Sequence, residues 1–400
     1  MNPPPTPRDV TATIARVGLD AFLRSGCKLD FRPRTTPKVS IVMLLCNRAE
    51  VTLACLRSLA FGLNTTPFEL ILVDNGSTDK TGAMLDQIEG ATIIRNPQNV
   101  GYPMGVNQGV AQASGEYLLL LNNDTEVLGR SIDAAVECLD TNASVGMVGG
   151  RVVLLDGTLQ EAGCVIWRDG WPGQFARGWS PDDPAVMFER DVDYCSAAFM
   201  MTRRQLFVQS GGFDEVFSPG YFEDPDFSVR LRRAGWRARY LPDIVILHYE
   251  NATSSSLFNV KELSRRNHRL FCARHADWLE NQPPCGLLPM LHHRRADDIG
   301  LNVLVVGASS TTERTVLALE SLGAMVTVAM NDAGSVRLPR TVEVVPVASR
   351  ADLERLLMMR MGYYQFALCD GDPPADLRAL LLSAKLNLAQ REGSEFRMVA

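Results

Sequence analysis

The sequence lacks the cysteine pairs, the apolar leader and the long apolar runs that mark secreted or membrane-spanning proteins. Its nine cysteines are odd in number and none forms a CxxC pair, which argues against a disulfide framework or a structural zinc and fits reduced thiols. Residues 1–7 are Pro-rich and lack the apolar core of a signal peptide. No run approaches the roughly eighteen apolar residues of a membrane span. We therefore expect a soluble, cytoplasmic protein that can dock peripherally at the inner face of a membrane.

An excess of positive charge is also missing. The chain has 40 Lys and Arg against 46 Asp and Glu, so its net charge is −6, and its basic runs are short. A surface that binds a polyanion needs the opposite balance, so we expect no nucleic-acid partner. The 46% hydrophobic and 22% charged residues are typical of a globular protein, and 400 residues give room for two domains.

The sequence does contain a regular alternation of buried-strand and helix patterns. Apolar runs at Val39–Leu45, Phe68–Val73 and Tyr117–Leu121 predict parallel strands covered on both faces, with helical spacing between them. The predicted fold class is therefore α/β, an open mixed, mostly parallel sheet flanked by helices. In such sheets ligands bind at the carboxyl ends of the strands.

Composition divides the chain into four stretches. Residues 1–37 are a Pro-rich lead with one short helix, and residues 38–280 carry the alternating pattern. Residues 281–299, with Pro283-Pro284 and a charged cluster, read as a linker, and residues 300–400 begin a second α/β unit. The strands of this second unit amount to about half of those in a dinucleotide-binding fold.

Polar side chains follow two of the predicted strands. A side-chain oxygen of Asp74 or Asn75 at a strand end can accept the N3–H of uracil or thymine, whereas cytosine and purines offer no such donor. A carboxylate in the turn Asn122-Asn123-Asp124 can bind Mg²⁺ or Mn²⁺ together with phosphate oxygens. Each turn is equally explained as an Asx turn or a helix cap.

Two further features lie in the second half of the predicted domain. Glu223-Asp224-Pro225-Asp226 places three carboxylates at a helix start, where clustered like charges keep one pKa high enough for a general base. Capping and the helix dipole explain the same residues without catalysis. His248 ends an apolar strand, where a histidine is more often a hydrogen-bonded surface residue than a ligand.

The order of these features resembles the family 2 glycosyltransferases, in the rhamnosyltransferase-like branch with the GT-A fold. The resemblance covers Lys38 to about His248, roughly half of the chain. The matching segments are Val39–Arg48, Leu72–Asp79, Asn99–Gly109, Gly115–Thr125, Gly211–Glu215, Tyr221–Asp226 and finally His248. The resemblance implies a glycosyltransferase that takes a sugar from a UDP- or dTDP-sugar and transfers it to a glycan or a lipid-linked saccharide in cell-surface polysaccharide synthesis.

The resemblance also implies roles for single residues. Asp224 would deprotonate the acceptor hydroxyl, with Glu223 and Asp226 supporting it, and Asp124 with His248 would bind a divalent cation, Mn²⁺ or Mg²⁺. The implied nucleotide-sugar contacts are Asn47, Asp74, Asn75, Asn107, Asn122 and Asn123.

Two departures from the family pattern bear on these roles. Asn122 replaces the first acid of the DxD-like motif, so fewer charges hold the cation, and Cys195–Ala198 replaces the usual Gly-Ala of the acceptor side. The sequence shows no Ser/His/Asp or Cys/His nucleophile set, which favours a single, inverting displacement.

The C-terminal stretch resembles the opening half of a GT-B-type Rossmann domain. Gly307 stands without the other glycines of a dinucleotide fingerprint, so we expect no NAD binding and an accessory, noncatalytic unit. Two other functions stay open for the chain as a whole. One is a nucleotidyltransferase, although Cys46-Asn47-Arg48 is not a triphosphate loop, and the other is a noncatalytic nucleotide-sugar- or glycan-binding protein.

Overall fold

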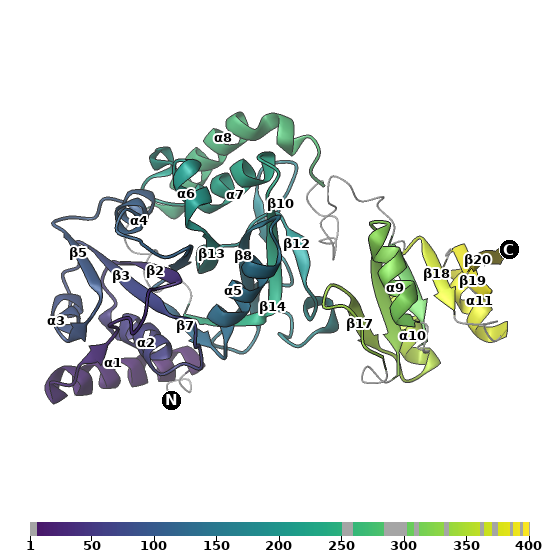
Figure 1. The fold of residues 1–400 in the computed structure, drawn as a ribbon, viewed down its shortest axis with the longest axis horizontal. Helices are drawn as coiled ribbons and strands as arrows, with labels where there is room; N and C mark the ends of the chain where they lie inside the picture. The colour runs from purple at the N-terminus through teal and green to yellow at the C-terminus, as the bar shows by residue number, and fades with distance from the viewer. Residues whose placement is uncertain are drawn as a thin grey trace, which may run out of the picture. The chain divides into compact units, whose positions relative to one another are not determined.

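The computed structural model describes residues 6–249, 259–283, 302–307, 312–331, 336–360, 364–369, 375–384, 387–392 and 395–399 (Figure 1). The chain folds as two compact units, one of Met1–Pro181 with Val192–Met290 and one of Asp182–Asp191 with Leu291–Ala400. Residues 182–191 therefore belong with the C-terminal unit, which the sequence did not indicate. The predicted linker lies almost wholly outside the described residues, and the predicted domain limits stay predictions. No helix in the described ranges is long and apolar enough to cross a membrane.

The first unit is built on one mixed sheet. Its strands are β2 (Val39–Leu45), β3 (Phe68–Asn75), β5 (Thr92–Asn96), β6 (Tyr117–Leu121), β7 (Thr125–Leu128), β8 (Val145–Leu154), β9 (Leu159–Ala162), β13 (Phe199–Arg203) and β14 (Arg237–His248). The spatial order is β12-β14-β8-β13-β6-β2-β3-β5, where β12 is the short strand Arg190–Val192, with β7 beside β14 and β9 beside β8. The strands β6, β2, β3 and β5 are parallel, whereas β13 is antiparallel to both of its neighbours. The predicted open, mixed α/β sheet is confirmed.

Helices and short strands complete this unit. The helices are α1 (Pro7–Ser25), α2 (Ala49–Ala60), α3 (Thr81–Leu85), α4 (Tyr102–Val110), α5 (Ser131–Thr141), α6 (Arg204–Gln209), α7 (Glu223–Arg233) and α8 (Val260–Leu279). The short strands are β1 (Leu29–Asp30), β4 (Ile88–Glu89), β10 (Cys164–Ile166), β11 (Pro172–Gln174) and β12 (Arg190–Val192), the last of which crosses the division between the units. The 3₁₀ turns are Pro184–Val186 and Glu215–Phe217.

The central strands are buried because helices cover both faces of the sheet. Nearly every residue of β2 and all of β6 are buried, as their continuous apolar runs require. On one face α4 packs directly on β2 through two glycines. A Cβ at Gly105 would lie 2.4 Å from Leu44, and one at Gly109 would lie 2.5 Å from Val42. This close packing fixes α4 against the carboxyl end of β2, where the polar segments gather.

The C-terminal unit has a sheet of its own. Its elements are β15 (Asn302–Val306), α9 (Thr312–Ser321), β16 (Met325–Met330), β17 (Glu343–Pro346), α10 (Arg350–Met359), β18 (Phe366–Cys369), α11 (Ala375–Ser383), β19 (Asn387–Glu392) and β20 (Glu395–Val399). The strand order is β17-β16-β15-β18-β19-β20, and only β20 is antiparallel to its neighbour. This is the doubly wound order 3-2-1-4-5-6. The expectation of about half the strands is wrong, because β19 and β20 near the chain end had no strong apolar signal.

Candidate active site

One cavity of about 370 Å³ lies at the carboxyl ends of the central strands. The ends of β2 and β3, the turn after β6, the end of β14 and the start of α7 all contribute to its wall. The lining residues are Leu44, Cys46, Asn75, Asn99, Tyr102, Asn122, Asn123, Asp124, Gln160, Ser196, Ala197, Ala198, Pro219, Gly220, Tyr221, Glu223, Asp224, His248 and Leu263. Seven of the eleven residues expected at the site from the sequence therefore line one cavity.

Asp124 and His248 meet in this cavity although 124 residues separate them. The antiparallel pairing of β7 with β14 places His248 opposite Thr125, and His248 Nε2 lies 3.1 Å from Asp124 Oδ1. Gln160 Oε1 lies 2.6 Å from His248 Nδ1 and accepts a hydrogen bond from the N–H of that nitrogen. A neutral imidazole then turns a lone pair toward the carboxylate.

This pair fits a divalent cation. An imidazole nitrogen and a carboxylate oxygen are common ligands of Mn²⁺. A metal-bound histidine ordinarily donates a hydrogen bond from its other nitrogen, as His248 does to Gln160. Two acceptors facing each other at 3.1 Å also need a cation or a proton between them. Within the described ranges no group of three or more His, Cys, Asp or Glu is placed so that it could hold a metal ion by itself. Mn²⁺ and Mg²⁺ commonly complete their coordination with water and phosphate oxygens.

The three predicted nucleotide contacts at the ends of β2 and β3 are Asn47, Asp74 and Asn75. Their side chains bind mainly to the loops that follow β3. Asn75 Oδ1 accepts from Val100 N at 3.0 Å and from Asn96, while its Nδ2 donates to Asn99 Oδ1 at 2.9 Å. Asn75 still lines the cavity, since its position at the end of β3 puts it at the floor. Asn47 and Asp74 are not among the residues that line the cavity. Asn47 Oδ1 accepts from the amides of residues 78 and 79, and Asp74 Oδ1 accepts from the amide of residue 77.

Asn122 and Asn123 take different positions in the turn after β6. Asn122 Oδ1 accepts a long hydrogen bond, 3.4 Å, from the hydroxyl of Tyr102, so both side chains lie in the cavity. Asn123 Nδ2 donates to Thr52 Oγ1 at 2.8 Å and is buried. The turn is thus fixed on α2, and its next residue, Asp124, is directed at the cavity.

Asn107 is not brought to this cavity. Its Nδ2 donates to Phe213 O at 2.8 Å and its Oδ1 accepts from Phe213 N at 3.1 Å. Because both of its polar atoms bind one backbone segment, Asn107 ties α4 to the Gly211–Asp214 turn. Both polar atoms of Asn107 are therefore engaged away from the cavity.

Asp224 and Glu223 are neighbouring carboxylates at the start of α7, and both line the cavity. Asp224 Oδ2 accepts from Ala197 N at 3.3 Å. Burial raises the pKa of Asp224 to about 7, against the lowering effect of that amide. Burial and the neighbouring Asp224 raise the pKa of Glu223 well above its ordinary value, and Glu223 Oε2 is buried without a partner among the described residues. A carboxylate with a pKa near neutrality can accept a proton at working pH.

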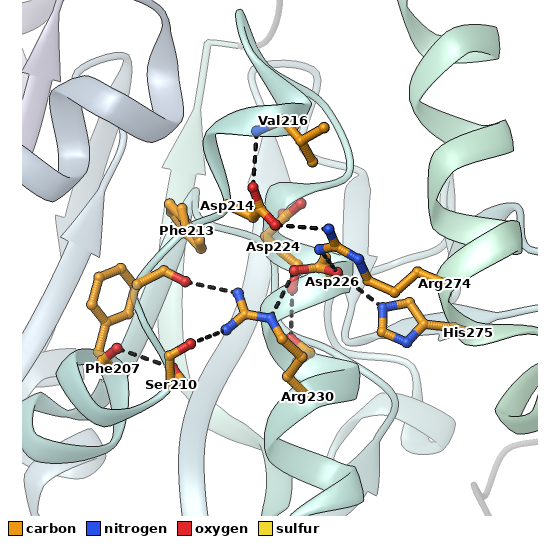
Figure 2. A network of polar contacts seen from close by, with 12 residues as sticks. Phe207, Ser210, Phe213, Asp214, Val216, Asp224, Asp226, Arg230, Arg274 and His275 are labelled. Carbon is orange, nitrogen blue, oxygen red and sulfur yellow. Dashed lines mark hydrogen bonds and ion pairs between the residues drawn. The ribbon is translucent and has the colours of Figure 1, made fainter.

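Asp226, for which the sequence predicted a supporting role beside Asp224, does not line the cavity. It is fully buried and binds Arg230 at 2.8 Å, Arg274 at 2.9 Å and His275 at 2.9 Å (Figure 2). Burial alone would raise the pKa of Asp226, but the bond from His275 and the two guanidinium groups outweigh it and lower that pKa. On a helix, residues two apart point in different directions, so Asp226 faces α8 while Asp224 faces the cavity.

Three residues of the site had no assigned role from sequence. Gln160 orients His248, and Glu161 accepts from Ser196 Oγ at 2.6 Å and raises the pKa of Asp224 through its charge. Burial raises the pKa of Tyr102, and the carboxylates of residues 223, 224 and 124 raise it further, so the Tyr102 hydroxyl stays a donor among all three acids. Only Tyr102 had a sequence signal, its place in the Asn99–Gly109 motif.

The chain is similar to glycosyltransferases of known sequence and structure. Residues 40–208 match the family model described as glycosyl transferase family 2. The chain is 31% identical over 262 residues, 62% of its length, to the O-antigen biosynthesis protein RfbC of Myxococcus xanthus, but spans only 20% of that protein. It is 27% identical over 237 residues, 53% of its length, to the N-acetylglucosaminyl-diphospho-decaprenol L-rhamnosyltransferase of Mycobacterium tuberculosis, 77% of which is covered. The crystal structure of GalNAc-T7 with UDP, GalNAc and Mn²⁺ aligns with a TM-score of 0.49 at 12% identity, covering 61% of this chain and 50% of that one.

Proposed function

We propose that this chain transfers a sugar, with inversion, from a UDP- or dTDP-sugar to a saccharide or lipid-linked glycan, as the match of residues 40–208 to the model described as glycosyl transferase family 2 supports. The observation that carries the proposal is the shared cavity. It joins a cation pair, Asp124 with His248, to a carboxylate with a raised pKa, Asp224. The names of the relatives, an O-antigen biosynthesis protein and an N-acetylglucosaminyl-diphospho-decaprenol rhamnosyltransferase, support a saccharide or lipid-linked acceptor in polysaccharide synthesis.

The residues would share the reaction as follows. Asp224 takes the proton of the acceptor hydroxyl while that oxygen attacks the anomeric carbon, and the bond from this carbon to the diphosphate oxygen breaks. A divalent cation bound by Asp124 and His248 would neutralise the charge of the leaving nucleoside diphosphate. Tyr102 keeps its hydroxyl proton and donates within the cavity, and Asn75 and Asn99 form the wall beside β3. A nucleotidyltransferase would need a basic, Gly-rich loop after the first strand to hold a triphosphate, and Cys46-Asn47-Arg48 is not such a loop.

A panel of UDP-, dTDP- and GDP-sugars tests the proposal. Each donor is incubated with the full chain and Mn²⁺ or Mg²⁺, and released nucleoside diphosphate is measured with and without EDTA. We expect one donor class to be hydrolysed slowly and only with the metal. If every donor raises the melting temperature but none is ever cleaved or transferred, the chain is a noncatalytic nucleotide-sugar-binding protein.

The pH dependence follows from the raised pKa of Asp224. A general base works only when ionised, so kcat/KM should rise with pH through an apparent pKa of about 7 and level off above it. Well below pH 7 the rate should fall about tenfold for each pH unit. A profile of kcat/KM from pH 5 to 9 checks this. An acid limb near pH 4, the ordinary range of an aspartate, would show that this carboxylate is not the base.

The domain limits make a further prediction. All cavity residues lie before residue 280, so a fragment of residues 1–279 should retain metal-dependent donor hydrolysis. Glu189 donates its amide to Arg340 O at 2.8 Å and pairs with the Arg340 side chain at 3.2 Å. Since the fragment lacks Arg340, we expect lower solubility with a similar donor KM. A folded fragment that binds no donor would show that residues 280–400 are needed to form the site.

A further inference from the structure

The backbone directly before the proposed base has an unfavourable conformation. Tyr221 and Phe222 have φ angles of 73° and 76°, a region that residues with a side chain rarely occupy. Such residues persist only where the surrounding structure holds them, and they gather at functional sites. Gly220 and Tyr221 line the cavity, and so does Glu223, the residue directly after Phe222. The position of Asp224 therefore depends on what holds this turn.

Helix α8 supplies the groups that hold it. Asn267 is fully buried, and its Nδ2 lies 2.8 Å from Phe217 O, 2.9 Å from Gly220 O and 2.9 Å from Tyr221 O. Its Oδ1 is buried with no partner among the described residues, so every contact this amide makes goes to the turn. One residue earlier, Arg266 donates to Ser218 O at 2.8 Å and to the carbonyl of residue 216 at 3.0 Å.

A second contact, two turns further along α8, holds the chain that follows Asp224. Arg274 bridges two acids, with Nη2 2.7 Å from Asp214 Oδ2 and Nη1 2.9 Å from Asp226 Oδ1 (Figure 2). Asp226 also binds Arg230, whose other nitrogens donate to Ser210 O and Gly212 O at 2.6 and 2.7 Å. Figure 2 shows these groups arranged between α7, α8 and the turn that contains Asp214. The Gly211–Glu215 and Tyr221–Asp226 motifs are thus joined through one arginine of α8.

We propose that Asn267 and Arg274 of α8 are positioning residues, which hold residues 220–226 so that Asp224 faces the cavity. The inference rests on the proposed function, because it assigns these residues to the proposed base. Neither side chain touches the cavity, and neither is a catalytic residue. Asn267 fixes the strained turn in front of Asp224, and Arg274 fixes the carboxylate that follows it.

Two substitutions and one matched control separate positioning from general stability. Arg274→Gln removes the bridge between Asp214 and Asp226, and its side chain is 36% exposed, so the variant should fold. Asn267→Ala removes the donor to the turn. Arg233→Gln is the control, because Arg233 also joins α7 to α8, through Asp277 at 2.8 Å, but at the far end of α7. All variants are made in the full chain, and their melting temperatures are measured first.

Two readouts are then compared at a temperature well below every melting point. Arg274→Gln and Asn267→Ala should lower kcat by about 10–100-fold, the effect of a misplaced catalytic group, with donor KM within about twofold of the parent. Hydrogen exchange of the backbone amides of residues 216–226 should become faster in both variants. Arg233→Gln should change neither quantity, even if it lowers the melting temperature.

Several results would overturn the inference. One is a loss of stability in Arg274→Gln with kcat unchanged, and another is an equal fall of kcat in the Arg233→Gln control. If Asn267→Ala does not fold, the kcat and exchange rates of Arg274→Gln alone test the positioning role. If the parent chain transfers no sugar, the proposed function fails, and the exchange rates still test the structural claim. Faster exchange in residues 216–226 would support it, and unchanged exchange would contradict it.

Discussion

Asp224→Asn should lower the transfer rate by roughly 10²–10⁴-fold while donor affinity stays nearly unchanged. The amide keeps the size of the carboxylate, but it cannot take the proton of the acceptor hydroxyl. The variant should keep the hydrogen bond to Ala197, since an amide oxygen can accept from the same backbone N–H. The loss is therefore confined to the transition state. Donor affinity by calorimetry and transfer under single-turnover conditions measure the two effects separately.

The same variant should be more stable than the parent at high pH. The pKa of Asp224 rises from an ordinary value near 3.8 to about 7 in the folded protein. A raised pKa means that the folded state favours the protonated acid, so this contribution is full at pH 4 and lost as pH rises toward 7. Asparagine stays neutral at every pH, so the variant does not lose this stability when the pH rises. We expect Asp224→Asn to melt above the parent at pH 8 and near it at pH 4.

Other outcomes would reassign the base. If donor affinity collapses while bound donor still turns over, Asp224 is a binding residue, and Glu223 becomes the candidate because it lines the same cavity. Asp226 is no longer an alternative, since it is fully buried in its ion pairs. Glu223→Gln, measured in parallel, distinguishes the two cavity carboxylates. Equal losses in both variants would mean that the pair shares one proton.

The sequence predicted the strands and their polar ends because those signals are local. Val39–Leu45 and Tyr117–Leu121 are continuous apolar runs that a buried strand requires, and the observed β2 and β6 have the same bounds. Asp124 follows β6 directly, so its place at the carboxyl edge of the sheet follows from chain order. The acidic run forms the first turn of α7, which begins at Glu223, because acids in a first turn are favourable there.

Pairings between distant side chains could not be predicted in the same way. Asn107 binds Phe213 across 106 positions, and Asp226 meets His275 across 49. Residue type and spacing do not reveal such partners, since they depend on how α4, α7 and α8 pack. His248 shows the same limit. Its approach to Asp124 requires the β7–β14 pairing, and only the family resemblance indicated it beforehand.

Asp124→Ala should abolish the metal dependence of donor binding and leave the fold intact. Asp124 is the only carboxylate in the turn after β6, and it contributes one of two ligands in the pair with His248. Without it, one imidazole remains, which cannot hold Mn²⁺ or Mg²⁺ in competition with water. Donor affinity with Mn²⁺ should fall to the level measured in EDTA. Calorimetry with MnCl₂ alone provides a readout that does not depend on turnover.

A graded series makes this test specific. His248→Ala should give a smaller loss, because the carboxylate can still bind a cation with phosphate oxygens. Gln160→Leu should weaken Mn²⁺ binding by about 10–100-fold, since it removes only the partner that orients His248. Asp156→Ala is the control, because that carboxylate is exposed and bonds only within its own turn to Thr158. If Asp124→Ala keeps full Mn²⁺ affinity, the cation is held elsewhere. The short contact with His248 would then be a hydrogen bond between a protonated imidazole and a carboxylate.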